Sequence, residues 1–133
     1  MGAWGSGPFE NDDAGDWVYD LEGADDFALV RDALDVAGSR YLDAGEGAAA
    51  VAAAVVVAAA LDPSGVEGVP EAVTAWLDSH ARQVDPGDRR LATTALDRVL
   101  GERSELAELW DEAPDGPAWR EGVAALRARL AGG

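Results

Sequence analysis

Residues 48–61 read AAAVAAAVVVAAAL, an unbroken run of apolar side chains in a chain of 133 residues. Alanine is the best helix former, and the run has no polar face, so we predict a helix over residues 45–61 that other helices surround. The run is shorter than the roughly 20 residues that a membrane-spanning helix needs, and alanine adds little to insertion. The stretch therefore predicts a central buried helix.

Beyond Phe9, apolar residues recur at helical spacing, and no stretch keeps the two-residue alternation of a β-strand. Capping residues and glycine or proline stops divide the chain into segments. We therefore predict an all-α fold, a compact bundle of six or seven helices with a glycine-rich N-terminal arm, as a single domain over residues 1–133. The other predicted helices cover about residues 11–22, 25–37, 70–80, 85–100, 104–110 and 119–130.

The helix predicted over residues 25–37 has its apolar residues on one face. Its spacing predicts that all four of these side chains are buried, namely Phe27, Val30, Leu34 and Ala37. Gly38 follows them and suits the left-handed position after a helix end.

Charge divides the chain into two unequal parts. The sequence has 26 acidic and 10 basic residues and a net charge of −16. Residues 1–80 hold 16 of the acids and only two arginines, so the negative field belongs mainly to the N-terminal part. Such a field repels phosphate backbones and anionic lipids, which argues against direct nucleic-acid binding and against membrane binding. It favours a basic protein as the partner.

Residue types that the sequence lacks limit the catalytic chemistry and the cellular compartment that we expect for the protein. The chain has no cysteine, which excludes thiolate catalysis and cysteine-ligated zinc or iron–sulfur sites. The first 26 residues contain no lysine or arginine, so we expect no signal peptide and a cytoplasmic location. The turn Gly5-x-Gly7 precedes a helix, but without any lysine it cannot complete a phosphate-binding loop. We predict no cofactor.

The most unusual stretch is the opening, where residues 4–17 read WGSGPFENDDAGDW. Its glycines permit a positive φ or a close backbone approach, and its aromatic residues can fold back and pin the arm to the bundle. The residues that follow suit a helix cap and the acidic first turn of a helix. The candidate ligand or interface residues are Trp4, Gly5, Gly7, Phe9, Asn11, Asp12, Asp13 and Asp16.

The opening resembles that of a family of small, mostly bacterial proteins, the domain of unknown function 4259. The resemblance lies in Trp4-Gly5-x-Gly7-x-Phe9-x-Asn11-Asp12. It continues in Ser104-Glu105-Leu106-x-Glu108-Leu109-Trp110, in Trp119 and in the end Leu126-Arg127-x-Arg129-Leu130. It spans nearly the whole chain and implies a cytoplasmic bacterial protein, but it implies no activity and no catalytic residue. Relatives often carry a glutamate in the alanine-rich helix, where residues 48–61 have none, and this counts against a catalytic acid there.

Metal binding is the enzymatic alternative, because Asp12, Asp13, Asp16 and Asp20 recur at helical spacing and could present oxygens to a hard cation. The only histidine, His80, lacks the glutamate three residues earlier that bundle metal sites use. No serine lies in the Gly-x-Ser-x-Gly pattern of hydrolases. The five tryptophans fall on apolar faces, which predicts that they belong to the core.

The leading hypothesis is a non-enzymatic, acidic interaction protein that binds a basic protein partner, for example as an inhibitor or immunity protein. The alternative is a metal-dependent enzyme or small-ligand binder that uses the N-terminal aspartates. In a third interpretation the opening only holds the arm to the bundle, and any functional interface lies on another part of the surface. Self-association through the alanine-rich helix is one example of such an interface. The protein is then a monomer or a small homo-oligomer.

Overall fold

Seven α-helices and one short 3-10 helix occupy most of the chain that the computed structural model describes, namely residues 5, 7–63, 66 and 68–132. Within those residues there is no β-strand, and Leu42 and Ser104 form an isolated parallel bridge. The all-α prediction is confirmed. The elements are α1 (Asp12–Glu22), α2 (Ala28–Leu34), α3 (Ala44–Leu61), α4 (Glu71–His80), η2 (Ala81–Gln83), α5 (Pro86–Leu100), α6 (Glu105–Asp111) and α7 (Gly116–Gly132).

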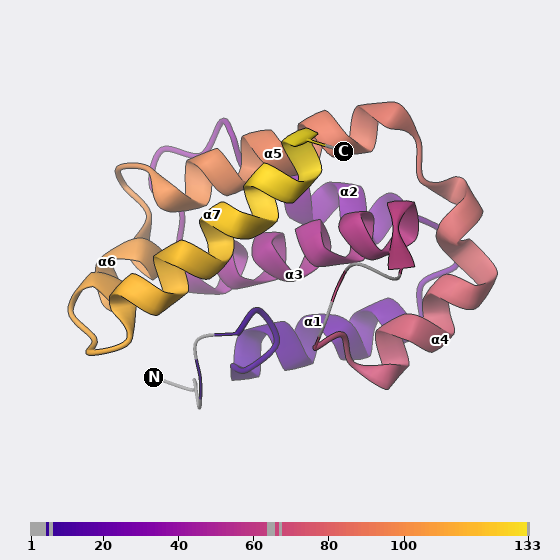
Figure 1. The fold of residues 1–133 in the computed structure, drawn as a ribbon, viewed down its shortest axis with the longest axis horizontal. Coiled ribbons are helices and arrows are strands. Elements are labelled where there is room, and N and C mark those ends of the chain that lie inside the picture. Colours follow the sequence, from indigo (N-terminus) through magenta and orange to yellow (C-terminus); the bar gives the residue numbers. More distant parts are fainter. Residues whose placement is uncertain (1–4, 6, 64–65, 67, 133) are drawn as a thin grey trace.

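Helix α3 runs through the centre of the bundle, as its apolar sequence predicts (Figure 1). All six other helices contact it, with α1 below, α5 and α7 above, and α4 and α6 at the two ends in the view of Figure 1. Every residue from Ala50 to Ala59 is buried. The helix is long and apolar enough to cross a membrane by composition alone, with a mean hydropathy of 1.9 over 18 residues, but 67% of it is buried inside this fold. Small side chains let the neighbouring helices approach it closely.

Helix α1 begins and packs as the sequence predicts. The Oδ1 atom of Asn11 accepts a hydrogen bond from the backbone N–H of Ala14 at 2.8 Å, which caps the helix. Two aspartates in the first turn lie at the positive end of the helix dipole. The buried face consists of Ala14, Trp17, Val18 and Leu21.

Helix α2 is shorter than predicted, and two expectations about its end are wrong. The helix ends at Leu34 because Asp35 leaves the helical conformation, with φ −84° and ψ 67°. The backbone after Leu34 is no longer helical, so Val36 is buried and Ala37, which was predicted to be buried, is exposed. Gly38 has no positive φ; among the described glycines only Gly68 does.

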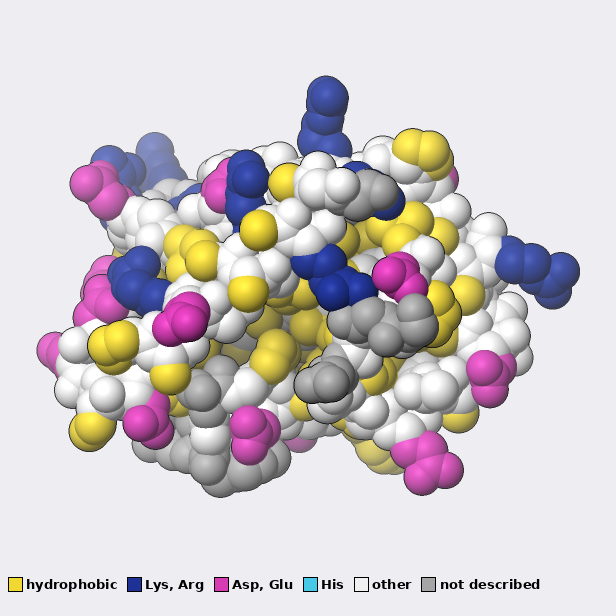
Figure 2. All heavy atoms as spheres, viewed as in Figure 1, with side chains coloured by type: hydrophobic (Ala, Val, Ile, Leu, Met, Phe, Trp, Pro, Cys, Tyr) yellow, Lys and Arg dark blue, Asp and Glu magenta, His cyan; other side chains and the backbone are white. Residues whose placement is uncertain are grey.

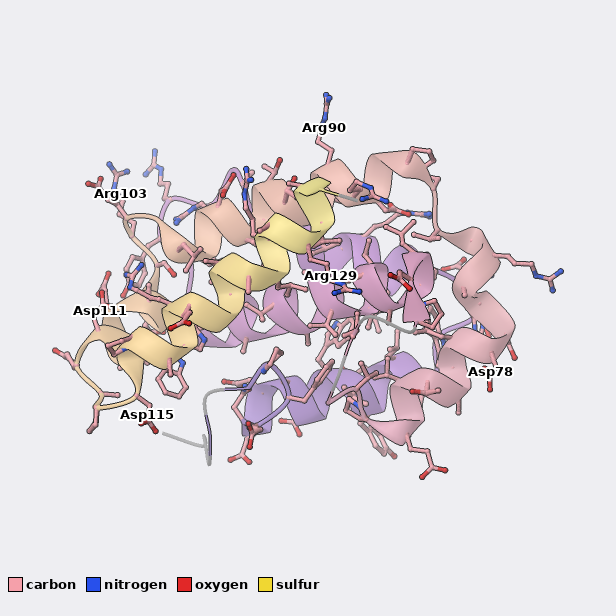
Figure 3. The ribbon with its side chains drawn as sticks, viewed as in Figure 1. Asp78, Arg90, Arg103, Asp111, Asp115 and Arg129 are labelled. Carbon is pink, nitrogen blue, oxygen red and sulfur yellow. The ribbon has the colours of Figure 1, made fainter. Side chains whose placement is uncertain are left out.

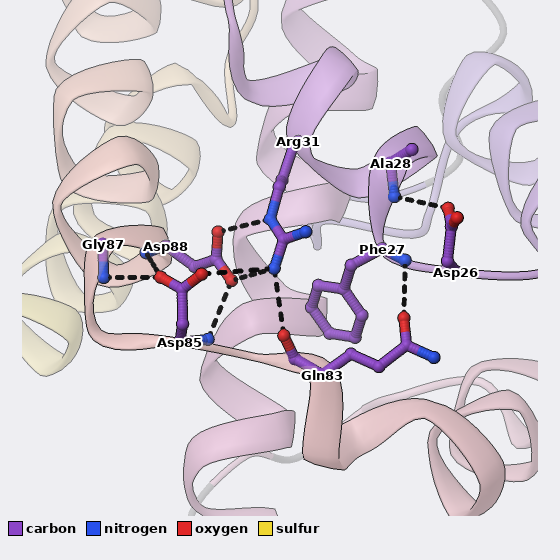
Figure 4. Close-up of polar contacts among 8 residues, drawn as sticks. All are labelled: Asp26, Phe27, Ala28, Arg31, Gln83, Asp85, Gly87 and Asp88. Atoms are coloured by element: carbon purple, nitrogen blue, oxygen red, sulfur yellow. Dashed lines mark hydrogen bonds and ion pairs between the residues drawn. The ribbon is translucent and has the colours of Figure 1, made fainter.

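An ion pair joins α2 to α5 (Figure 4). The guanidinium of Arg31 donates to both carboxylate oxygens of Asp88, at 2.8 and 3.0 Å, and to the carbonyl oxygen of Gln83 at 2.9 Å. Asp88 also closes the capping box of α5, because its Oδ2 atom accepts from the backbone N–H of Asp85. Burial would raise the pKa of Asp88, but the hydrogen bonds from Arg31 and Asp85 hold that pKa below its ordinary value.

Helices α6 and α7 contact α3 and each other. A Cβ atom on Gly47 would lie 3.3 Å from the side chain of Leu106, so glycine there lets α3 and α6 approach. The indoles of Trp110 and Trp119 stack with centroids 6.0 Å apart and an interplanar angle of 6°. These contacts hold α6 and α7 against the start of α3, beside the N-terminal arm.

Candidate functional site

The N-terminal arm folds around the carboxylate of Glu10, a residue that the sequence did not single out. The backbone N–H of Gly7 donates to Oε1 of Glu10 at 3.0 Å. A Cβ atom on Gly5 would lie 2.5 Å from Oε2, and one on Gly7 would lie 2.5 Å from Oε1. The carboxylate of Glu10 therefore lies directly against the backbone of both glycines, and neither glycine has a positive φ. A glutamate three residues after Gly-x-Gly is the sequence signal of this turn.

Two other residues of the opening hold the arm against the bundle. Phe9 is half-buried and packs against the hydrophobic core. Asn11 caps α1 through its oxygen, and its Nδ2 atom lies 3.5 Å from the carbonyl oxygen of Pro8. Trp4 lies outside the described residues, so its predicted packing stays a prediction.

A cavity of about 200 Å³ separates the arm from α6 and α7. Asn11, Asp12 and Asp13 form its polar wall, and Trp110 and Trp119 are part of its apolar wall. The remaining lining residues are Gly7, Pro8, Ala44, Ala48, Val51, Leu106 and Leu109. The stretches that carry the family resemblance, far apart in sequence, thus meet around this arm cavity.

The aspartates of α1 do not form a metal centre in the described part of the chain. Asp12, Asp13, Asp16 and Asp20 are all exposed. No group of three or more histidine, aspartate or glutamate side chains among the described residues is close enough to hold a metal ion. The helical spacing brings these aspartates to the surface of one helix without making their carboxylates converge.

All twelve acidic residues between residues 10 and 46 are exposed. In the described structure none of them lies within ion-pair distance of an arginine. The arginines instead pair with aspartates that lie later in the chain, namely Asp62, Asp85, Asp88, Asp97 and Asp111. We call this set the acidic surface: Glu10, Asp12, Asp13, Asp16, Asp20, Glu22, Asp25, Asp26, Asp32, Asp35, Asp43 and Glu46.

Carboxylates without a neighbouring arginine are separated from most of the arginines on one face of the molecule. On the face shown in Figure 2, carboxylates without neighbouring arginines lie along the lower edge, over α1 and α4, and most arginines lie above, over α5 and α7. Arg90 and Arg103 point outward, and Arg129 lies toward the end of α3, where it pairs with Asp62 at 3.3 Å (Figure 3). Among the aromatic residues that the structure describes, Tyr19 is the most exposed, at 77%, and it lies in α1 among the acids.

A second hollow, of about 260 Å³, opens between α1, α2 and α3. Its apolar lining residues are Trp17, Leu29, Ala33, Val36 and Ala49, and its acidic ones are Asp32, Asp35 and Glu46. A side-chain hydrogen bond with Asp43, together with partial burial, raises the pKa of Glu46. We call this feature the α1–α2–α3 hollow.

The remaining aromatic candidates have structural roles. His80 stacks on Trp76 with ring centroids 4.2 Å apart, and its Nδ1 atom lies 2.8 Å from the Trp76 carbonyl oxygen. The Trp76 indole donates to the carbonyl oxygen of Ala24 at 3.0 Å. The prediction of core tryptophans is confirmed for the four that the structure describes, Trp17, Trp76, Trp110 and Trp119.

Comparison with known proteins gives one match. The model of a protein family described as a domain of unknown function (DUF4259) matches residues 2–122. No curated protein and no solved structure matches the chain.

Proposed function

We propose that this chain, which belongs to the DUF4259 family of domains of unknown function, is an acidic interaction protein that binds a basic protein partner. The observation that carries the proposal is the acidic surface, whose twelve carboxylates are exposed and have no arginine within ion-pair distance in the described structure. A surface with this much uncompensated charge attracts a complementary partner over a long range and speeds the encounter.

The end of α1 supports an interaction role, because its charges are unfavourable for the isolated protein. Asp20 and Glu22 lie in or near the last turn of α1, which contains no basic residue. The C-terminal end of a helix carries partial negative charge, so acids there destabilise the helix. Side chains that lower stability without an internal partner are typical of surfaces retained for function.

Tyr19 gives the same surface an anchor for contact. It lies in α1 between Asp16 and Asp20, with 77% of its area exposed. Tyrosine is enriched among the residues that dominate binding energy in interfaces, since it buries a large ring and keeps a hydroxyl for hydrogen bonding. We therefore place the centre of the partner interface on Asp16, Tyr19 and Asp20.

Capture from lysate of the source organism tests the proposal. The test variant combines Asp16→Asn, Tyr19→Ala and Asp20→Asn, and the matched control combines Asp78→Asn with Glu121→Gln, two exposed acids on α4 and α7. We expect the wild type and the control to retain the same basic protein at low salt and the test variant to lose it. Raising the salt from about 0.1 M to about 1 M should release it, since the Debye length falls from about 10 Å to about 3 Å.

Two results would contradict the proposal. One is equal recovery of the basic protein by the test variant and the control. The other is recovery that does not change with salt, because a charge-driven encounter must weaken as the charges are screened.

A second candidate function, small-ligand binding, is favoured by the arm cavity. Asp12 and Asp13 line this cavity together with Trp110 and Trp119, a combination of acidic and aromatic residues that suits an amine with an apolar body. A thermal-shift screen of small amines, with magnesium, manganese, calcium and zinc ions alongside, tests this candidate and its metal-dependent form together. A melting temperature that none of them raises would contradict both.

A further inference from the structure

The α1–α2–α3 hollow combines a carboxylate rim with an apolar floor. Asp32, Asp35 and Glu46 supply the carboxylates, from the end of α2 and the start of α3. The half-buried side chains of Leu29, Ala33 and Ala49 form part of the floor, together with the buried Trp17 and Val36. A ligand for this hollow therefore needs a positive end and an apolar stem.

The arrangement of the carboxylates favours an extended organic cation over a metal ion. Among the described residues no three acidic side chains lie close enough to share one metal. A guanidinium group instead spreads its charge over five N–H donors and can bond several separated carboxylates at once. Its three-carbon stem covers apolar surface, and its flat face stacks on aromatic rings.

Trp17 supplies an observation that is independent of the acids. Its side chain lines the hollow and is 7% exposed, and its indole N–H is the buried side-chain polar group that lacks a hydrogen-bond partner in the described structure. The indole nitrogen itself has almost no accessible surface, so an occupant of the hollow contacts the Trp17 ring and not its N–H.

We propose that the α1–α2–α3 hollow receives an arginine side chain of the basic partner, with the guanidinium on Asp32, Asp35 and Glu46 and the stem on the apolar floor beside the Trp17 ring. This inference rests on the proposed function for the existence of the partner. The volume of about 260 Å³ supports a single long side chain as the occupant, because it lies below the about 300–1,000 Å³ of sites for drug-sized ligands.

Titration of the whole protein with N-acetyl-arginine methylamide, followed by NMR at the indole N–H resonances, tests the inference directly. We expect the Trp17 resonance to move and saturate, with a Kd on the order of 1 mM for one isolated residue. The citrulline analogue, which has the same shape without the charge, should produce no saturable shift. Absence of saturation with the arginine probe, or the same shift with citrulline, overturns the inference.

A pair of matched variants separates this hollow from general attraction to acidic charge. Asp32→Asn with Asp35→Asn removes two carboxylates from the rim, and Asp78→Asn with Glu121→Gln removes two exposed carboxylates outside it. We expect the first pair to weaken arginine binding at least tenfold, roughly the loss of one interfacial ion pair, and the second to change it less than twofold. Equal weakening by both pairs overturns the inference.

The two proposals can fail separately. If the arginine probe does not bind, the hollow has no such role, whatever the capture experiment shows. If the α1 variant captures the basic protein as well as the wild type does, the proposed function is wrong, whatever the titration shows. A third outcome is that the arginine probe binds the wild type, but the variant Asp32→Asn with Asp35→Asn captures the basic protein as well as the wild type does. In that case the partner places no arginine in the hollow, and the proposed function is unaffected.

Discussion

Gly116 at the start of α7 lies against the carbonyl group of Trp110 with no room for a side chain. A Cβ atom on Gly116 would overlap the Trp110 carbonyl oxygen, which belongs to backbone and cannot rotate away. We expect Gly116→Ala to lower the free energy of unfolding by about 1–3 kcal/mol, as overpacking does in well-packed cores. Urea denaturation monitored by circular dichroism measures this change.

Gly122→Ala is the matched control, because it makes the same change in the same helix. Gly122 is exposed, and a Cβ atom there would meet nothing within 4 Å. Alanine is the better helix former, so we expect this variant to gain about 0.5–1 kcal/mol. Equal stabilities for the two variants would show that α6 and α7 do not make the contact described.

Asp88→Asn removes the charge that Arg31 needs. The Asp88 side chain is only 4% exposed and accepts two hydrogen bonds from Arg31. We expect a loss of about 1.5–3 kcal/mol in the free energy of unfolding, the usual size for hydrogen bonds to a charged group, because the Arg31 side chain is 38% exposed and recovers part of its hydration. Asp97→Asn, which breaks an exposed pair with Arg127, should change stability by no more than about 1 kcal/mol.

The loss caused by Asp88→Asn should depend on pH. The pKa of Asp88 is lower in the folded protein than its ordinary value, so its ionised form stabilises the fold. That contribution is complete above the unfolded pKa of about 3.9 and disappears as the pH falls through the folded value. We therefore expect the stabilities of wild type and variant to converge below about pH 4 in urea titrations. A constant difference down to pH 2 would contradict the ion-pair assignment.

Asn11→Ala tests whether the opening motif supports α1. Its Oδ1 atom accepts from the backbone N–H of Ala14, and loss of such a cap lowers stability by about 1 kcal/mol. Asn11→Asp keeps the acceptor and should retain most of the stability. Thermal denaturation of the two variants distinguishes a cap from a residue that contacts only a ligand, since a ligand residue would leave both melting temperatures unchanged.

Most of the fold follows from the sequence because its signals are local. The apolar run of residues 48–61 has no polar side, and this feature alone places α3 in the centre. Asn11, Asp85 and Ser104 mark helix starts because a cap needs only the next three residues. The prediction for α2 is wrong at its end, because the period of apolar residues continues past Leu34 while the backbone turns at Asp35.

The candidate site was only partly predictable, because cavities depend on packing. The sequence indicates the unusual opening, but the arm cavity also needs Trp110 and Trp119, about a hundred residues away. The α1–α2–α3 hollow brings Trp17 beside acids of two other helices, and no spacing rule indicates that arrangement. The opening predicts that its glycines allow a close approach, but the glycines alone do not indicate that the approaching group is the carboxylate of Glu10.

Glu22→Arg should stabilise the protein, because Glu22 is the last residue of α1 and lies at the negative end of the helix dipole. We expect a gain of about 0.3–1 kcal/mol at low salt that shrinks as salt is added. Glu71→Arg, in the first turn of α4, is the matched control, because it makes the same change in net charge at the opposite end of a helix. It should destabilise the protein for the same electrostatic reason.

Both variants reduce the net negative charge by the same amount. The difference between their free energies of unfolding therefore reports only the position of the new charge in the helix. Equal stabilisation by Glu22→Arg and Glu71→Arg would mean that the surplus of negative charge, and not the helix end, limits stability. If Glu22→Arg stabilises the protein and also weakens capture of the basic partner, the acid at the end of α1 lowers stability while it supports binding. That pairing of effects is the trade-off expected of a surface retained for interaction.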